Sequence, residues 1–163
     1  KILTELNIPI YFITGNHEHY LKDFDNKMSK IKKTGFYLLN NSNVTIDSIN
    51  LIGLSDSTSK TEKIKIVKQI TNKELYNICL VHQPSIWDNV DKNVDLMLSG
   101  HTHRGQIFPF NFLVKLKFQY IYGLYRRKNC KLYVTSGAGT WGPRMRLGSL
   151  NEIVELRLRN SSL

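Results

Sequence analysis

The fold is decided by the stretch Val94-Asp95-Leu96-Met97-Leu98-Ser99-Gly100-His101-Thr102-His103, a mostly apolar run that ends in a glycine and two histidines. Residues 94–98 are short and apolar enough to predict a buried strand. Two further runs have this form: Ile8–Ile13 leads into Gly15-Asn16-His17, and Leu75–Val81 leads into His82. In open α/β sheets, ligands bind at the carboxyl ends of the strands. The sequence therefore predicts an α/β fold with histidine-bearing loops at one sheet edge.

The remaining chain predicts further helices and strands around these three runs. Apolar residues recur at helical spacing in 20–33 and again in Glu62–Ile70. Short apolar runs predict four more strands, the first two as a hairpin-like pair: Phe36–Ile46, Asn50–Leu54, Lys131–Ser136 and Asn151–Leu158. We find no linker or internal repeat, and treat residues 1–163 as a single, partial domain.

The positive charge of the chain is concentrated in one segment. The formal net charge is +10, from 23 Lys and Arg against 13 Asp and Glu. Residues 96–151 contain nine of the basic residues and no acidic one. Aromatic residues alternate with these cations, a pattern that fits either an anionic membrane surface or single-stranded nucleic acid. A plain solvated basic face is the alternative reading.

All five histidines lie at the three strand ends: His17, His19, His82, His101 and His103. A lone histidine is more often structural than functional, but three groups in one context favour a shared site. In an extended segment, residues i and i+2 project to the same side. Two histidines spaced in this way could each face one ion of a metal pair about 3.5–4 Å apart. The sequence therefore predicts a metal centre.

The other residues of these loops fit the same reading. Gly100 would let the backbone turn tightly beneath the histidine pair. The amide oxygen of Asn16 is a neutral ligand, and a mixture of imidazole and oxygen donors suits Mn, Fe or Zn better than Ca or Mg. His17 beside it could donate a proton to a substrate or leaving oxygen.

Three motifs in this order resemble motifs of the calcineurin-like metallophosphoesterase superfamily. They are Gly15-Asn16-His17-Glu18, the lone His82 after an apolar strand, and Gly100-His101-Thr102-His103-Arg104-Gly105-Gln106. The later segment 137–148 is similar to the membrane-associated bacterial branch. The resemblance implies the C-terminal part of a four-layer α/β/β/α sandwich that hydrolyses phosphoester or pyrophosphate bonds, with lipid-linked substrates favoured.

The resemblance also implies a role for each matching residue. Two divalent metal ions (Mn, Fe or Zn) are expected: Asn16, His82 and His101 would hold one of them, and His103 the other. His17 would contact the phosphate and act as proton donor. Four further residues carry weaker expectations: Arg104 as a phosphate contact, Glu18 and Asp56 as carboxylates behind the ligands, and His19 as a surface residue.

Two motifs of the superfamily are missing from the 163 residues: D-x-H and the G-D that bridges its metals. We therefore expect an N-terminally truncated fragment that binds at most one metal ion and is inactive alone. The alternative is a non-catalytic fragment or a binding module for an anionic membrane or, with less support, nucleic acid. For the complete protein, we expect a phosphorylated substrate; the sequence does not name the compartment, for which a peripheral position at the bacterial cell membrane is one candidate.

Overall fold

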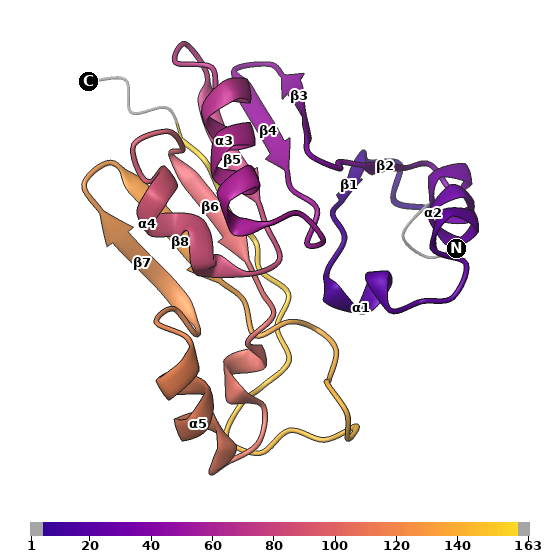
Figure 1. Ribbon diagram of the computed structural model, residues 1–163, viewed down its shortest axis with the longest axis vertical. Coiled ribbons are helices and arrows are strands. Elements are labelled where there is room, and N and C mark those ends of the chain that lie inside the picture. The colour runs from indigo at the N-terminus through magenta and orange to yellow at the C-terminus, as the bar shows by residue number, and fades with distance from the viewer. Residues whose placement is uncertain (1–4, 160–163) are drawn as a thin grey trace.

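A computed structural model of the protein describes residues 5–159, which form two β-sheets with helices on their outer faces (Figure 1). The smaller sheet pairs β1 (Ile10–Phe12) in parallel with β2 (Phe36–Leu38). The chain between these strands forms the short helix α1 (Asn16–His19) and the longer α2 (Phe24–Lys33). Among the described residues, no helix has the length and apolar character that crossing a bilayer requires.

The larger sheet has six strands in the order β3-β4-β5-β6-β8-β7. Its central strands β4, β5, β6 and β8 run parallel, whereas β3 and β7 pair antiparallel at the two edges. The strand bounds are β3 Ser42–Ile46, β4 Ile49–Gly53, β5 Tyr76–Leu80, β6 Leu96–Ser99, β7 Gly123–Arg127 and β8 Cys130–Val134. The helical bounds are α3 Lys60–Ile70, η2 Pro84–Ile86, α4 Trp87–Val90, η3 His103–Gly105 and α5 Phe110–Lys117.

Alternating side chains of the central strands divide the core between the two faces of this sheet. Ile52, Cys79 and Met97 are fully buried in a cluster that includes Val67 of α3. Their neighbours Leu51, Ile78 and Leu96 face the other way, where Tyr11 and Ile13 from the β1 region pack against them. The layers therefore run from α3 and α4 through the larger and the smaller sheet to α2, as expected for the α/β fold.

The two sheets also meet through polar contacts at the carboxyl ends of their strands. The Thr14 hydroxyl, just after β1, lies 3.3 Å from the hydroxyl of Ser55, just after β4. The Asn41 side chain accepts a hydrogen bond from the Ser55 backbone and donates one to Thr58. A Cβ on Gly53 would lie 2.2 Å from the Leu39 Cβ, so a glycine is required where the sheets approach. These contacts hold the loop after β1 beside the loops of the larger sheet.

Two of the expected strands are wrong in part or in whole. Residues 36–46 do not form one arm of a hairpin, because Asn41 adopts a left-handed φ of 55° that breaks the run. β2 then pairs with β1, and only β3 and β4 form the hairpin. Residues 151–159 form no strand, and β6 and β7 are the neighbours of β8 in the sheet. β7 carries no clear apolar pattern, so the sequence does not predict this strand.

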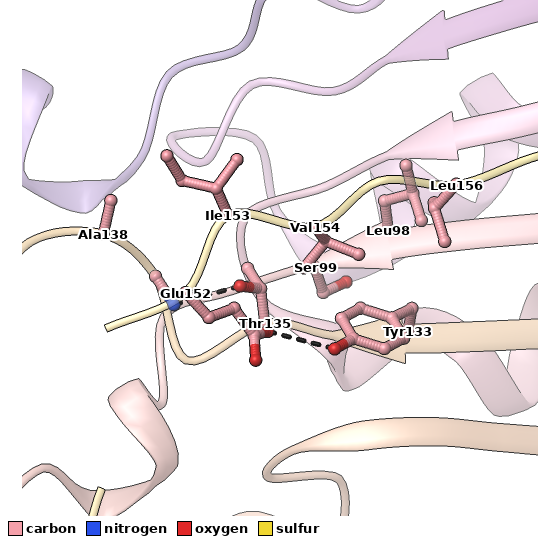
Figure 2. A pocket seen from close by; sticks show the side chains of 10 residues that line it. Leu98, Ser99, Tyr133, Thr135, Ala138, Glu152, Ile153, Val154 and Leu156 are labelled. Atoms are coloured by element: carbon pink, nitrogen blue, oxygen red, sulfur yellow. Dashed lines mark hydrogen bonds between the residues drawn. The ribbon is translucent and has the colours of Figure 1, made fainter. Parts of the chain in front are cut away.

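The segment 151–159 instead crosses one face of the sheet (Figure 2). The Glu152 carboxylate accepts hydrogen bonds from the hydroxyls of Tyr122 at 2.8 Å and Tyr133 at 3.1 Å. Val154 and Leu156 line a shallow pocket of about 350 Å³ together with Leu98 of β6. A carboxylate anchor, and not strand pairing, therefore fixes this segment.

Candidate functional site

Three side chains from separate strand ends converge at the carboxyl edge of the sheets. The His82 Nε2 lies 2.8 Å from the Asn16 Oδ1 and 3.0 Å from the His101 Nδ1. Asn16 follows β1, His82 follows β5 and His101 follows β6, so the parallel strands bring these three residues together. We refer to Asn16, His82 and His101 as the ligand trio.

The geometry of the trio suits a metal ion better than hydrogen bonding alone. Because His82 Nε2 carries one proton or one lone pair, at most one of its two contacts can be an ordinary hydrogen bond. Donor atoms about 2.1 Å from a shared ion would lie about 3 Å from each other, and both distances from His82 Nε2 are of this size. The described residues hold no metal-competent cluster of three or more His, Cys, Asp and Glu. The trio is not such a cluster because an amide supplies its third donor, and the residues fit a divalent ion.

Burial keeps the trio's imidazoles in the form that can bind a metal. Burial lowers the pKa of His82 and outweighs the opposing effect of the Asp56 and Glu18 carboxylates. Burial, reinforced by the neighbouring His82, also lowers the pKa of His101. Both rings are therefore mostly neutral at pH 7, with a lone pair available for coordination.

The loop that carries Asn16 is shaped around the His82 ring. A Cβ on Gly15 would lie 2.8 Å from the His82 Cε1 and Nδ1, so no other residue fits there without movement. The Glu18 carboxylate accepts a hydrogen bond from the Gly15 backbone nitrogen at 2.6 Å and thus closes the first turn of α1. Glu18 therefore fixes the turn that presents Asn16.

The two other histidines near β1 occupy different environments. His17 is exposed beside the trio, with its ring 6.1 Å from that of Tyr20. The expectation of a surface role for His19 is wrong, because His19 is half-buried. Its Nε2 lies 3.1 Å from the Thr14 hydroxyl, and its ring stacks on Phe24 with the centroids 4.8 Å apart. His19 thus supports the contact between the sheets.

The histidine pair after β6 is close together, but for a different reason than we expected. His101 and His103 have left-handed φ angles of 71° and 48°, so the segment is a bend and not an extended strand. Gly100 has no positive φ, and a Cβ there would only meet Thr135 Cγ2 at an ordinary 3.6 Å. The essential glycine is Gly105, whose φ is 74° and whose added Cβ would lie 2.4 Å from the Asn111 Cα.

Both histidines of the bend line one cavity of about 650 Å³. One wall is polar and contains the ligand trio, His17 and His103. The apolar part of the lining comes mainly from α5 and the segment around Trp141. The cavity is large enough for a small organic phosphate with an attached apolar group.

The two remaining candidates lie outside this cavity wall. The described residues that line the cavity do not include Arg104, whose guanidinium lies over the Tyr122 ring, 4.3 Å from its centroid. The Asp56 carboxylate accepts hydrogen bonds from Gln83 Nε2 at 3.1 and 3.2 Å and lies 3.6 Å from the Lys63 ammonium. Asp56 and Lys63 are a buried pair behind His82, so Asp56 supports the strand end.

Sequence reasoning missed two residues that organise the cavity. The Arg146 guanidinium donates to the carbonyls of Ser136 at 2.7 Å and Gly137 at 3.1 Å, and to that of His103 at 3.3 Å. Gln106 is buried, and its amide group binds both the backbone nitrogen and the carbonyl of Trp141, at 2.6 and 2.7 Å. Both residues lie in the basic segment 96–151, but its charge does not reveal that their side chains hold the backbone around the cavity.

The chain also matches known proteins in sequence. The family model of the calcineurin-like phosphoesterases matches residues 1–105. An uncharacterized metallophosphoesterase of Campylobacter jejuni is 39% identical over 91% of this chain and 42% of its own length. One from Aquifex aeolicus is 33% identical over 98% of this chain and 65% of its own length.

Relatives are also found among vertebrates. A transmembrane protein with metallophosphoesterase domain from Danio rerio is 31% identical over 93% of this chain and 39% of its own length. No solved structure matches the chain significantly. The chain spans about two fifths of the length of relatives such as the Campylobacter protein. Proteins of this family generally use divalent metal ions. On the match over residues 1–105, the chain belongs to the calcineurin-like phosphoesterase family.

Proposed function

We propose that this chain supplies part of the active centre of a metal-dependent hydrolase of phosphoester or pyrophosphate bonds. The proposal rests on three donor atoms that converge in the lining of the cavity. His82 Nε2 lies 2.8 Å from Asn16 Oδ1 and 3.0 Å from His101 Nδ1. Neutral donors at this spacing accept a divalent ion, and the family to which the chain belongs is consistent with phosphoester chemistry.

Each residue at the polar wall then has a separate task. The trio would hold one ion and His103 would contribute to a second, with the other ligands supplied by the rest of the protein. When bound, the metal ions would neutralise charge on the phosphate and acidify a water molecule. His17 is exposed at the same wall and free to approach a substrate, so we assign it protonation of the leaving oxygen.

The apolar part of the lining supports a substrate with an apolar portion. Phe110, Leu113 and Val114 of α5 line the same cavity as the histidines. A bare nucleotide or inorganic phosphate would leave these side chains without a partner, whereas an acyl or prenyl chain would cover them. We therefore propose a lipid-linked phosphoester or pyrophosphate as the substrate class.

The test compares His17→Ala with His82→Ala in the complete protein loaded with Mn²⁺. Hydrolysis of bis(p-nitrophenyl) phosphate and the bound metal content are measured on the same samples. We expect His17→Ala to lower kcat by about 10²–10⁴-fold with unchanged metal content, because general acid catalysis contributes this much. His82→Ala should lose both the hydrolytic activity and the bound metal.

Two results would overturn the proposal. Loss of metal in His17→Ala equal to that in His82→Ala would make His17 a ligand and not a proton donor. A metal-loaded complete protein that hydrolyses neither phosphodiesters nor pyrophosphates would favour the non-catalytic reading.

A further inference from the structure

We propose that the outer face of α5 docks on an anionic membrane surface and thereby holds the cavity at the level of the lipid headgroups. We call this surface, formed by Phe108, Phe112, Lys115, Leu116 and Leu147, the α5 outer patch. The proposal rests on the proposed function, because it names the place where a lipid-linked substrate would meet the site.

Helix α5 has two faces with different surroundings. Phe110, Leu113, Val114 and Lys117 recur at helical spacing and all line the cavity. Phe112 and Leu116 lie on the other side of the helix and are 54% and 85% exposed, compared with 60% for each of Phe110 and Leu113 on the cavity side. None of the eight residues of α5 is buried, although five of them are Phe, Leu or Val. A helix with an apolar side facing water is incomplete unless something covers it.

The exposed apolar side chains of this region form one continuous surface. The Phe108 and Phe112 rings contact edge to face, with their centroids 5.9 Å apart. The Phe108 backbone nitrogen donates to the Leu147 carbonyl at 2.8 Å, which places Leu147 beside it. Phe108 and Leu147 are each 53% exposed. Four large apolar side chains, from Leu147 through Phe108 and Phe112 to Leu116, thus face solvent together.

The charge of the α5 outer patch favours an anionic occupant. Helix α5 carries Lys115 and Lys117 and no Asp or Glu, whereas Arg127 of the basic segment pairs with Asp88 and Arg146 is bound to backbone carbonyls. The Lys115 ammonium lies 5.8 Å from the centroid of the Phe112 ring, so the cation and the apolar group share one location. Aromatic and Leu side chains interspersed with Lys are typical of helices that lie in a membrane interface, where the rings enter the acyl boundary and the ammonium groups bind phosphates.

Docking in this way would orient the active cavity. Figure 1 shows α5 at one end of the molecule, beyond the larger sheet. Because one face of α5 is the apolar wall of the cavity, insertion of the other face brings the opening next to the bilayer. An acyl chain could then pass from the bilayer along Leu113 to the polar wall, without full exposure to water.

The experiment measures flotation of the full chain with phosphatidylcholine vesicles that do or do not contain phosphatidylglycerol. The double variant Phe112→Gln/Leu116→Gln removes the inserted groups but keeps good helix formers. The matched control is Leu124→Gln, which removes a 48% exposed apolar side chain from β7. Lys115→Gln tests the charge, with Lys68→Gln on α3 as its control. Circular dichroism and thermal unfolding verify that each variant folds.

We expect the chain to prefer the anionic vesicles. The double variant should bind at least about tenfold more weakly, since half-exposed Phe and Leu side chains no longer leave water. Lys115→Gln should weaken binding about fivefold, the usual effect of one basic residue near an anionic surface. Both controls should bind like the unmodified chain. Hydrolysis of a soluble phosphodiester by the complete protein should be unchanged in the double variant, so vesicle binding and the proposed activity can fail independently.

Three results would overturn the proposal. The first is equal binding to both vesicle types. The second is a loss in Leu124→Gln as large as that in the double variant. The third is absence of vesicle binding together with a dimer, or a complex with single-stranded nucleic acid, that the double variant abolishes; either would identify a different occupant of the patch.

Discussion

Replacing Gly15 by alanine should disrupt the ligand trio through a single methyl group. The new Cβ would lie 2.8 Å from two ring atoms of His82 and 3.1 Å from the Glu18 Oε2. Carbon atoms pack best at about 3.5–4.0 Å, so the ring and the loop must separate by about 1 Å. The trio atoms now lie 2.8 and 3.0 Å apart, and this shift would remove one ligand from any ion that the others hold. We expect Mn²⁺ to bind about 10–100-fold more weakly, as when a residue supporting a metal ligand is lost.

Gly100→Ala is the matched control, since Gly100 also precedes a trio residue. Its added Cβ would meet only the Thr135 Cγ2 at 3.6 Å, and its φ is not left-handed. Isothermal titration calorimetry measures the affinity, and thermal unfolding measures the stability of each variant. Overpacking at Gly15 should also cost about 1–3 kcal/mol of unfolding free energy. Unchanged Mn²⁺ affinity in Gly15→Ala, or an equal loss in Gly100→Ala, would refute the reasoning.

Three further predictions concern the number of metal ions, the Glu152 carboxylate and the hydrogen bonds of Arg146. Calorimetry with Mn²⁺ should give at most one site per isolated chain; two tight sites would contradict the assignment of the missing ligands to the rest of the protein. Burial raises the pKa of Glu152, but hydrogen bonds from Thr135, Tyr122 and Tyr133 outweigh it and hold the pKa below its ordinary value. The ionised carboxylate therefore stabilises the fold at pH values above the ordinary Glu pKa. This stabilisation is lost as the pH falls through the lower pKa of Glu152 in the folded protein. Glu152→Gln should lack this contribution in urea unfolding between pH 3 and 6, whereas an equal pH dependence in both proteins would disprove it. Arg146→Lys should lower the unfolding free energy by about 2 kcal/mol, because an ammonium cannot reproduce the guanidinium's bonds to separate carbonyls. Amide exchange at Gly137, whose backbone nitrogen donates to the Thr135 hydroxyl at 3.0 Å, should accelerate in that variant, and unchanged exchange would count against this role of Arg146.

The sequence predicts the central strands and the convergence of the trio because both follow from local patterns. Leu75–Val81 and Val94–Leu98 are apolar runs that end in histidines, and parallel pairing places those ends together. The pairing of β1 with β2 is not local, since Asn41 interrupts what reads as one strand. The apolar residues of 151–158 read as a strand, but the segment is anchored by the contacts of the Glu152 carboxylate with Tyr122 and Tyr133. Such contacts depend on the folded sheet and not on the local pattern.

The sequence indicated which residues form the candidate site, but not the backbone conformation that presents them. The spacing of His101 and His103 indicated an extended segment, whereas both adopt left-handed φ angles in a bend. The bend also brings Gly105 against Asn111, a residue of a helix that the sequence did not predict. The hydrogen bonds of Arg146 could not be predicted either, because they go to backbone carbonyls, which no side-chain pattern reveals.

The ligand trio draws on both sheets, and this couples metal binding to the docking equilibrium between them. Asn16 follows the smaller sheet, while His82 and His101 follow strands of the larger one. An ion held by all three is a tether, and its apparent affinity falls in proportion to the time that the smaller sheet spends undocked. The coupling is reciprocal, so a chelator should accelerate amide exchange in β1 while leaving β5 and β6 protected. A replacement at the Thr14 and Ser55 contact could therefore weaken metal binding without touching a ligand.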